Sequence, residues 1–216
     1  MEHRHEESLD GFRTIAVSLV IIHHWFPSDL WYNNLSLGMV GVTMFFTLSG
    51  FLITGILLRN KESGQRVGTI FKNFYIRRSL RIFPIYYLFV FALFATGCFK
   101  SMAYFISCLT YTSNFYVFVI NKWPDFAGHT WSLAVEEQFY LIWPFVLLFS
   151  KANTRNLLLF FVGLGIASRI VFVLLCSPES LHAVLTPNCF DCFALGGGTR
   201  LLYTYLLRRT KEIAYI

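Results

Sequence analysis

Long apolar runs separated by short basic segments dominate the pattern of this 216-residue chain. An α-helix needs about 20 residues to cross a bilayer, and six runs approach that length. They are residues 9–26, 35–58, 82–99, 131–150, 157–176 and 190–207. Hydrophobic residues make up 56% of the chain and charged residues only 14%. We therefore predict an all-α, polytopic integral membrane bundle of about six to seven transmembrane helices, forming a single domain over residues 1–216.

One further apolar segment, residues 102–120, is ambiguous. Its apolar residues are interrupted by more polar groups than a lipid-facing span tolerates. We predict a re-entrant or surface helix on the outer side, which leaves six spans. The alternative has seven spans, with this segment crossing the membrane. The interrupting residues are Ser107, Thr110, Tyr111, Thr112, Ser113 and Asn114.

The distribution of basic residues predicts the orientation. Residues 59–81 contain seven basic side chains against the single acidic Glu62. Basic loops are retained on the cytoplasmic side, so this segment and the N-terminus are expected there. Two further basic segments, at residues 151–155 and 208–211, fall on the same side if the polar segment does not cross. The expected location is the inner (plasma) membrane, with residues 27–36 outside.

Arg13 and His24 are ionisable residues inside the first apolar run, where such side chains are costly and usually functional. Eleven helical positions make three turns plus roughly 20°, so the two residues share one face, about 16 Å apart along the axis. His23 lies about 80° away from that face. The pair suits a ligand held at both ends. Alternatively, His24 is an ordinary helix-end residue beside the interfacial Trp25.

Arg77, Arg78 and Arg81 are expected to open the third span at the cytoplasmic face. Such a cluster sets orientation or binds lipid head groups. It is equally suited to a phosphorylated ligand, because guanidinium groups pair bidentately with phosphate. Residue type alone leaves these interpretations open.

The adjacent carboxylates Glu136 and Glu137 lie near the start of another predicted span, at the level of the outer surface. Two carboxylates there are either solvated or belong to a pocket. The neighbouring Trp131 and Tyr140 favour a pocket with polar and stacking surfaces.

Five cysteines are scattered through apolar sequence, and we expect buried thiols and no metal. Cys189 and Cys192 have metal-ligand spacing, but no second pair of ligands accompanies them. Small residues of the second run are expected to allow close helix packing and to carry no chemistry. They are Gly38, Gly41, Ser49, Gly50 and Gly55.

Four motifs, in order along nearly the whole chain, resemble the membrane-bound acyltransferase 3 family. They are LDGFR at residues 9–13 followed after ten residues by His24, GVTMFFTLSGFLITGILL at 41–58, RRSLRIFP at 77–84, and the stretch 129–144. The family's proposed catalytic signature, an arginine and a histidine with ten residues between them, falls on Arg13 and His24. The family usually has about ten spans, so the resemblance implies a C-terminally truncated member.

The resemblance implies an acyltransferase that moves an acyl group, commonly acetyl, from cytoplasmic acyl-CoA to a hydroxyl of an extracytoplasmic carbohydrate. O-antigen of lipopolysaccharide and exopolysaccharide are among the acceptors it implies. The other expected partners are the lipid bilayer and a protein that supplies the missing spans, and no nucleic acid. We expect no cofactor apart from the acyl-CoA donor substrate. The alternatives are an inactive truncated membrane fragment and, less favoured because related halves are not evident, a transporter.

Within that mechanism, His24 is expected to act as general base or as acyl acceptor. Arg13 would guide the donor. Glu136 or Glu137 would orient the imidazole or bind sugar hydroxyls. The remaining roles are donor-phosphate binding by Arg77, Arg78 and Arg81, and acceptor binding by Trp131, Ser132 and Tyr140.

Overall fold

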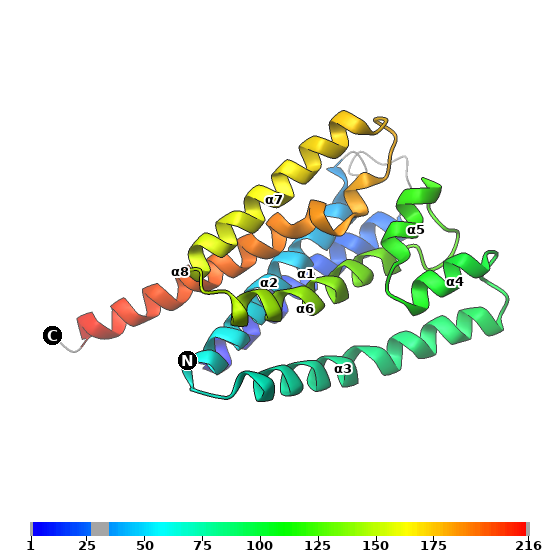
Figure 1. Ribbon diagram of the computed structural model, residues 1–216. Coiled ribbons are helices and arrows are strands. Elements are labelled where there is room, and N and C mark those ends of the chain that lie inside the picture. Colours follow the sequence, from blue (N-terminus) through cyan, green and yellow to red (C-terminus); the bar gives the residue numbers. More distant parts are fainter. Residues whose placement is uncertain (1, 27–34, 215–216) are drawn as a thin grey trace.

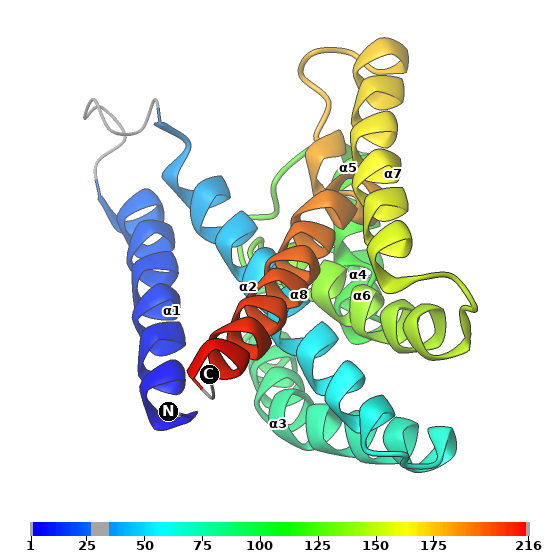
Figure 2. The same ribbon diagram turned by 90° about the vertical axis from the view of Figure 1, so that its left-hand side faces the viewer.

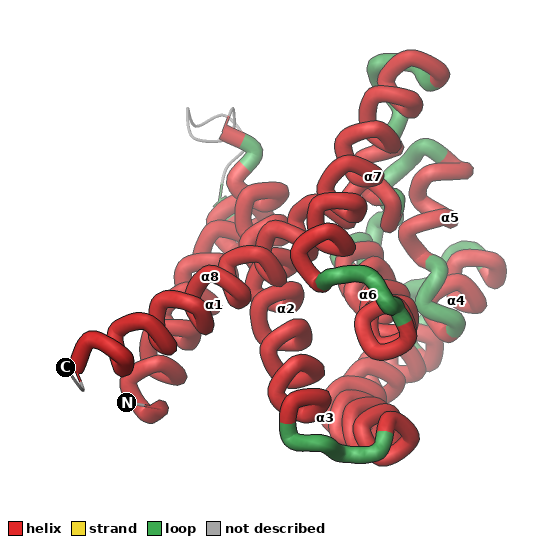
Figure 3. The backbone as a smooth tube through the Cα atoms, turned by 60° about the vertical axis from the view of Figure 1, so that its left-hand side comes forward, coloured by secondary structure: helices red, strands yellow, loops and turns green. Residues whose placement is uncertain are grey.

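The computed structural model describes residues 2–26 and 35–214, and the described part contains helices and loops but no strand (Figure 3). Two pairs of short helices connect the longer ones: α4 (Met102–Leu109) with α5 (Ser113–Ile120), and the 3₁₀ turns His182–Val184 and Thr186–Cys189. The long helices are α1 (Glu2–Trp25), α2 (Leu37–Glu62), α3 (Val67–Ala95), α6 (Thr130–Phe149), α7 (Thr154–Leu175) and α8 (Phe190–Ala214).

The prediction of an all-helical membrane protein is confirmed. Helices α2, α3, α6 and α7 are long and apolar enough to cross a membrane. Helices α1 and α8 contain 24 and 25 residues, which is also sufficient by length. Each of the six predicted runs therefore overlaps one long helix. The expected outer loop at residues 27–36 lies mostly outside the described residues, which stop at 26 and resume at 35.

The predicted start of the third span, residue 82, is wrong, because α3 begins at Val67. Its first half is amphipathic rather than continuously apolar. Ile70 and Phe74 are buried one turn apart, and the Phe71 ring lies 4.6 Å from Phe145 of α6. This packing stabilises four helical turns that the hydropathy pattern alone did not indicate.

The ambiguous segment forms two helices of eight residues each, about 12 Å long, which are too short to cross a bilayer. Tyr111, with φ 53°, separates them. Tyrosine side chains fix the segment to its neighbours: Tyr86 of α3 donates to the Cys108 carbonyl at 2.7 Å, and Tyr104 donates to the Ala127 carbonyl at 2.7 Å. The segment therefore lies at the end of the bundle, as the six-span interpretation predicts.

Figure 1 shows that the chain termini and the α2–α3 and α6–α7 connections share one end of the bundle. The basic segments 59–66, 151–155 and 208–211 all fall at this end. Arg208 supports the arrangement, because its Nη2 donates to both carboxylate oxygens of Glu62, at 3.0 and 3.1 Å. The short helices α4 and α5 lie at the opposite end.

Helix α2 is the central element, with α1 on one side and α8 crossing it closely (Figure 2). A Cβ atom at Gly50 would lie 2.0 Å from the Phe193 carbonyl oxygen, and one at Gly196 would lie 1.9 Å from that of Thr47. A Cβ at Gly41 would lie 2.6 Å from the Ala16 carbonyl oxygen. The prediction of close packing at the α2 glycines is confirmed, since backbone meets backbone at both contacts.

Candidate active site

Glu136 of α6 lies inside the bundle and is held by two hydroxyl groups. Ser49 of α2 donates a hydrogen bond to Oε1 at 2.9 Å, and Tyr140, one turn further along α6, donates to Oε2 at 3.2 Å. The Ser49 and Tyr140 hydroxyl oxygens are themselves 3.0 Å apart. Hydrogen bonds to each oxygen offset part of the cost of placing a carboxylate away from water. The expectation that Ser49 serves packing alone is therefore wrong.

Arg78 of α3 completes this group. Its guanidinium carbon lies 5.0 Å from the centre of the Tyr140 ring and 6.0 Å from that of Phe74. The charges of Arg78 and Arg81 also lie near enough to act on the Glu136 carboxylate. Arg78 is eleven residues from the start of α3, about 16 Å along its axis. It thus lies beside the middle of α6, where Tyr140 is located.

The other two arginines differ in their surroundings. Arg77 is exposed. Arg81 lines a cavity of about 310 Å³ between α3 and α6. Phe89 and His129 line the other part of the cavity, so its wall follows α3 from Arg81 to Phe89, about 12 Å.

Arg13 and His24 both lie on α1, as predicted, but they contact different groups. Arg13 Nη1 donates to Asp10 Oδ1 at 2.5 Å. The exposed His24 ring meets the His23 ring edge-on, with centroids 5.2 Å apart. His23 packs on α2, where a Cβ at Gly38 would lie 2.4 Å from its Cδ2. Both histidines are exposed, and His23 is the one that contacts α2.

His129 immediately precedes α6 and lines the α3–α6 cavity. It is near enough to His24 for the charge of His24 to act on it. Its ring lies 5.7 Å from the Phe89 ring. Partial desolvation, and then the charge of the nearby His24, lower the pKa of His129 below 6.5. A lowered pKa keeps this imidazole neutral and able to accept a proton. The sequence analysis gave it no role because its partner is distant in the chain.

Glu137 faces away from Glu136, toward α3 and the α4–α5 segment. Its charge acts on the Tyr87 and Tyr111 hydroxyls. Glu137 Oε1 and the Tyr111 hydroxyl are both buried and have no hydrogen-bond partner among the described residues. In the described part of the chain no hydrogen bond joins either glutamate to His24, so the structure does not bring together the carboxylate–imidazole pair that was expected.

Trp131 is only 5% exposed and packs between Phe46 and Trp123, with ring centres 6.1 and 6.3 Å away. Neither face of its indole is free, which does not favour the expected stacking on a sugar. Ser132 donates to the carbonyl of His129, and Tyr140 is buried in the Glu136 group. The three residues expected to bind the acceptor therefore all make contacts within the protein.

Trp123, in contrast, is 45% exposed and lines a second cavity, of about 210 Å³. The cavity lies beside α4 and α5, at the end of the bundle opposite the basic segments. Its walls combine aromatic rings with charged groups, a composition suited to sugars. The sequence pattern missed it because Trp123 follows α5 in a loop. Its other aromatic and polar side chains include Tyr104, Tyr116, Lys100, Lys122 and Asp125.

The thiols of Cys189 and Cys192 lie close to the α7–α8 contact. Burial raises the pKa of the Cys189 thiol, which contacts the Ala183 carbonyl at 3.7 Å. Among the described residues, no three His, Cys, Asp or Glu side chains are grouped so that they could hold a metal ion.

A helical bundle with spans long enough to cross a membrane and an internal carboxylate–hydroxyl group, formed by Ser49, Glu136 and Tyr140, defines a polytopic membrane protein with an internal polar site. The profile of the family described as "Acyltransferase domain" (Acyl_transf_3) matches residues 6–213. The chain therefore belongs to this acyltransferase family, and the resemblance inferred from the motifs is confirmed.

Curated relatives include two proteins named for peptidoglycan. The chain is 35% identical to "Peptidoglycan O-acetyltransferase OatA" of Listeria monocytogenes, over 95% of the chain and 35% of the relative. It is 34% identical to "Putative peptidoglycan O-acetyltransferase YrhL" of Bacillus subtilis, over 86% of the chain and 30% of the relative. "O-acetyltransferase OatA" of Staphylococcus aureus is also 34% identical, over 74% and 28%. The chain thus spans about a third of the length of these relatives. No solved structure matches it.

Proposed function

We propose that the chain transfers an acetyl group from acyl-CoA, supplied at the basic end of the bundle, to a hydroxyl group of peptidoglycan at the opposite end. The observation that carries the proposal is the α3–α6 cavity, which has Arg81 in its wall and His129, electrostatically coupled to His24, at its other part. The printed names of the relatives favour peptidoglycan over O-antigen or exopolysaccharide as acceptor. The basic end faces the cytoplasm in this proposal, in accord with the positive-inside rule.

For the donor, phosphate binding is assigned to Arg78 and Arg81 rather than to all three arginines of the cluster. Glu136 fixes the Tyr140 hydroxyl, and the Tyr140 ring supports the Arg78 guanidinium. A guanidinium held in this way loses little freedom when it binds a phosphate group. Arg81 lines the cavity directly and guides the thioester arm toward His129.

For the acceptor, the exposed Trp123 takes the role first assigned to Trp131. Its ring offers a face to the sugar, and Lys100, Lys122 and Asp125 offer polar groups beside it. The loop containing Trp123 continues directly into His129, so a glycan bound there would lie near the histidine pair.

In the chemical step, neutral His24 accepts the proton of the acceptor hydroxyl as its oxygen attacks the thioester carbonyl. The ester C–O bond forms, the C–S bond breaks, and the CoA thiolate leaves and takes up a proton. In the alternative covalent route, the imidazole first takes the acyl group and then passes it to the hydroxyl. His129, kept neutral by its surroundings, is placed to share the proton with His24.

The test is acetyl transfer by the chain itself in membranes. The chain is expressed in bacteria whose peptidoglycan lacks O-acetyl esters, and acetate released from purified peptidoglycan by mild base is quantified. Transfer of radiolabelled acetate from acetyl-CoA is measured in parallel in membrane vesicles. Both signals are expected with the unaltered chain and not with His24→Ala. Correct membrane insertion without transfer of label to any glycan would support the inactive-fragment alternative and overturn the proposal.

A further inference from the structure

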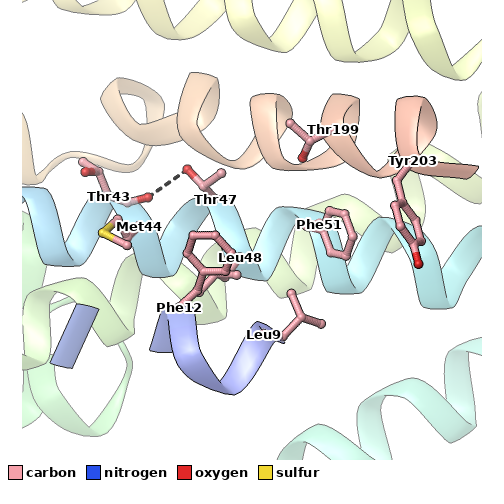
Figure 4. A pocket seen from close by; sticks show the side chains of 9 residues that line it. All are labelled: Leu9, Phe12, Thr43, Met44, Thr47, Leu48, Phe51, Thr199 and Tyr203. Carbon is pink, nitrogen blue, oxygen red and sulfur yellow. Dashed lines mark hydrogen bonds between the residues drawn. The ribbon is translucent and has the colours of Figure 1, made fainter. Parts of the chain in front are cut away.

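A third cavity lies on the side of α2 away from the Glu136 group. It has a volume of about 520 Å³, is open on one side, and is lined by residues of α1, α2 and α8 (Figure 4). Thr47 of α2 lines it, whereas Ser49, two positions and about 200° further round the helix, belongs to the candidate active site. The acyltransferase proposal does not use this cavity.

The cavity wall is apolar even where it contains hydroxyl groups. Thr43, Thr47 and Thr199 each donate to a carbonyl of their own helix, at 2.9, 2.9 and 2.8 Å. Their hydroxyls are therefore satisfied, which leaves methyl groups to face the cavity. From Thr43 to Phe51 the wall follows α2 for about 12 Å, a length suited to part of one hydrocarbon chain.

One end of the cavity adjoins the guanidinium group of Arg200. Phe51 and Tyr203 form that end in Figure 4, facing each other from α2 and α8. The Arg200 guanidinium carbon lies 5.2 Å from the Phe51 ring centre and 5.5 Å from that of Tyr203. The Arg59 guanidinium is near enough for its charge to act on Arg200.

Arg200 has no acidic partner in the described part of the chain, where no carboxylate forms an ion pair with it and its buried Nε has no hydrogen-bond partner. Its side chain lies against Gly55, where a Cβ would be 2.6 Å from Nε. Gly55 is seven residues, about 10 Å, from the end of α2 at Glu62. An unpaired guanidinium at this depth is costly unless an anion reaches it.

From this arrangement we infer that the α1–α2–α8 cavity binds one anionic phospholipid, whose phosphate group contacts Arg200 and whose acyl chain lies along Thr43 to Phe51. Charge complementarity selects an anionic head group, and the apolar wall selects a hydrocarbon chain rather than a free anion. The basic end of the bundle is the side on which such pockets meet anionic head groups.

The experiment measures lipid binding to the purified full chain in a neutral detergent by native mass spectrometry. Phosphatidylglycerol and phosphatidylcholine with identical acyl chains are compared, with glycerol 3-phosphate as the head group alone. Phosphatidylglycerol is expected to bind about tenfold more tightly than phosphatidylcholine, as one charge-assisted contact implies. Glycerol 3-phosphate is not expected to bind measurably.

Arg200→Gln should abolish the preference for phosphatidylglycerol, whereas Arg209→Gln, which changes an exposed arginine of the same helix, should retain it. Arg200→Lys keeps the charge and should retain part of it. Thr199→Phe fills the cavity from an exposed position and should weaken the binding of both lipids. Equal binding of the two lipids, equal behaviour of the two glutamine variants, or strong binding of glycerol 3-phosphate alone would each overturn the inference. None of these measurements depends on acetyl transfer.

Discussion

The Ser49 hydroxyl donates a hydrogen bond of 2.9 Å to Glu136 Oε1, and so joins α2 to α6 across 87 positions of the sequence. This contact, rather than a contact within one motif, holds the candidate active site together. Because Tyr140 binds the other oxygen of the same carboxylate and supports Arg78, a change at Ser49 is transmitted to the arginine.

We therefore predict that Ser49→Ala lowers both stability and acetyl transfer. Loss of one donor leaves a buried carboxylate oxygen less satisfied, which costs about 1–3 kcal/mol. The thermal midpoint of unfolding and the acetate content of peptidoglycan are the measurements. Thr14→Ala is the control, since the Thr14 hydroxyl bonds only within its own helix, to the Asp10 carbonyl. Equal effects of the two substitutions would contradict the role given to Ser49.

The neighbours Arg77 and Arg78 form a matched pair for testing the donor site. Arg78→Gln removes the guanidinium that lies over Tyr140, whereas Arg77→Gln removes an exposed one. We expect the apparent affinity for acetyl-CoA to fall about tenfold or more in the first variant, because a charge-assisted contact is lost. It should change little in the second. If both substitutions only disturb membrane insertion, the cluster is a topology signal.

Much of the fold was accessible from hydropathy, because a span must satisfy its backbone internally and must therefore be a long apolar helix. The first half of α3 was not, since its stability comes from Ile70 and Phe74 packing on distant residues. For the candidate site, the sequence identified separate motifs but not the contacts between them. Sequence periodicity places residues on a helix face, but it does not tell which helix that face meets. The contact of Ser49 with Glu136 and the electrostatic influence of His24 on His129 could therefore not be predicted from it.

The same limit applies to the contact between α7 and α8. Arg169 donates through Nη2 to Asp191 Oδ1 at 2.7 Å and through Nε to the Asn188 carbonyl at 2.9 Å. Both charged residues fall in predicted spans, yet nothing in their spacing of 22 positions indicates that they pair.

Orientation is predicted to follow the basic segments. Cysteine introduced at Lys61, Lys151 or Arg208 should be labelled from the cytoplasmic side, and cysteine at Lys122 or Trp123 from the outside. Trp123 suits this test because it is 45% exposed, whereas the buried Trp131 would not react in either topology. Labelling of position 151 from outside would refute the proposed arrangement.

Stability is predicted to depend on pH through His129. Its pKa is lowered from 6.5 by partial desolvation and by His24, so below that pH the unfolded chain binds more protons than the folded one. Stability should therefore fall as the pH is lowered through 6.5, and level off once folded His129 is also protonated. His129→Gln should show a smaller loss between neutral pH and about pH 5, measured as the thermal midpoint. An unchanged pH dependence in that variant would show that folding does not lower the pKa of His129.

The two adjacent histidines give the most direct test of the chemistry, because the structure assigns them different contacts. His24→Ala removes the proposed base and should reduce acetyl transfer by about 100- to 10,000-fold. The thermal midpoint should remain nearly unchanged, since the His24 side chain is exposed. His23→Ala removes the ring that packs on Gly38, so it should lower the thermal midpoint and reduce transfer far less per folded molecule. Normal O-acetylation with alanine at position 24, at matched levels of membrane-inserted protein, would exclude His24 as base or acyl acceptor and leave His129 as the imidazole to test next.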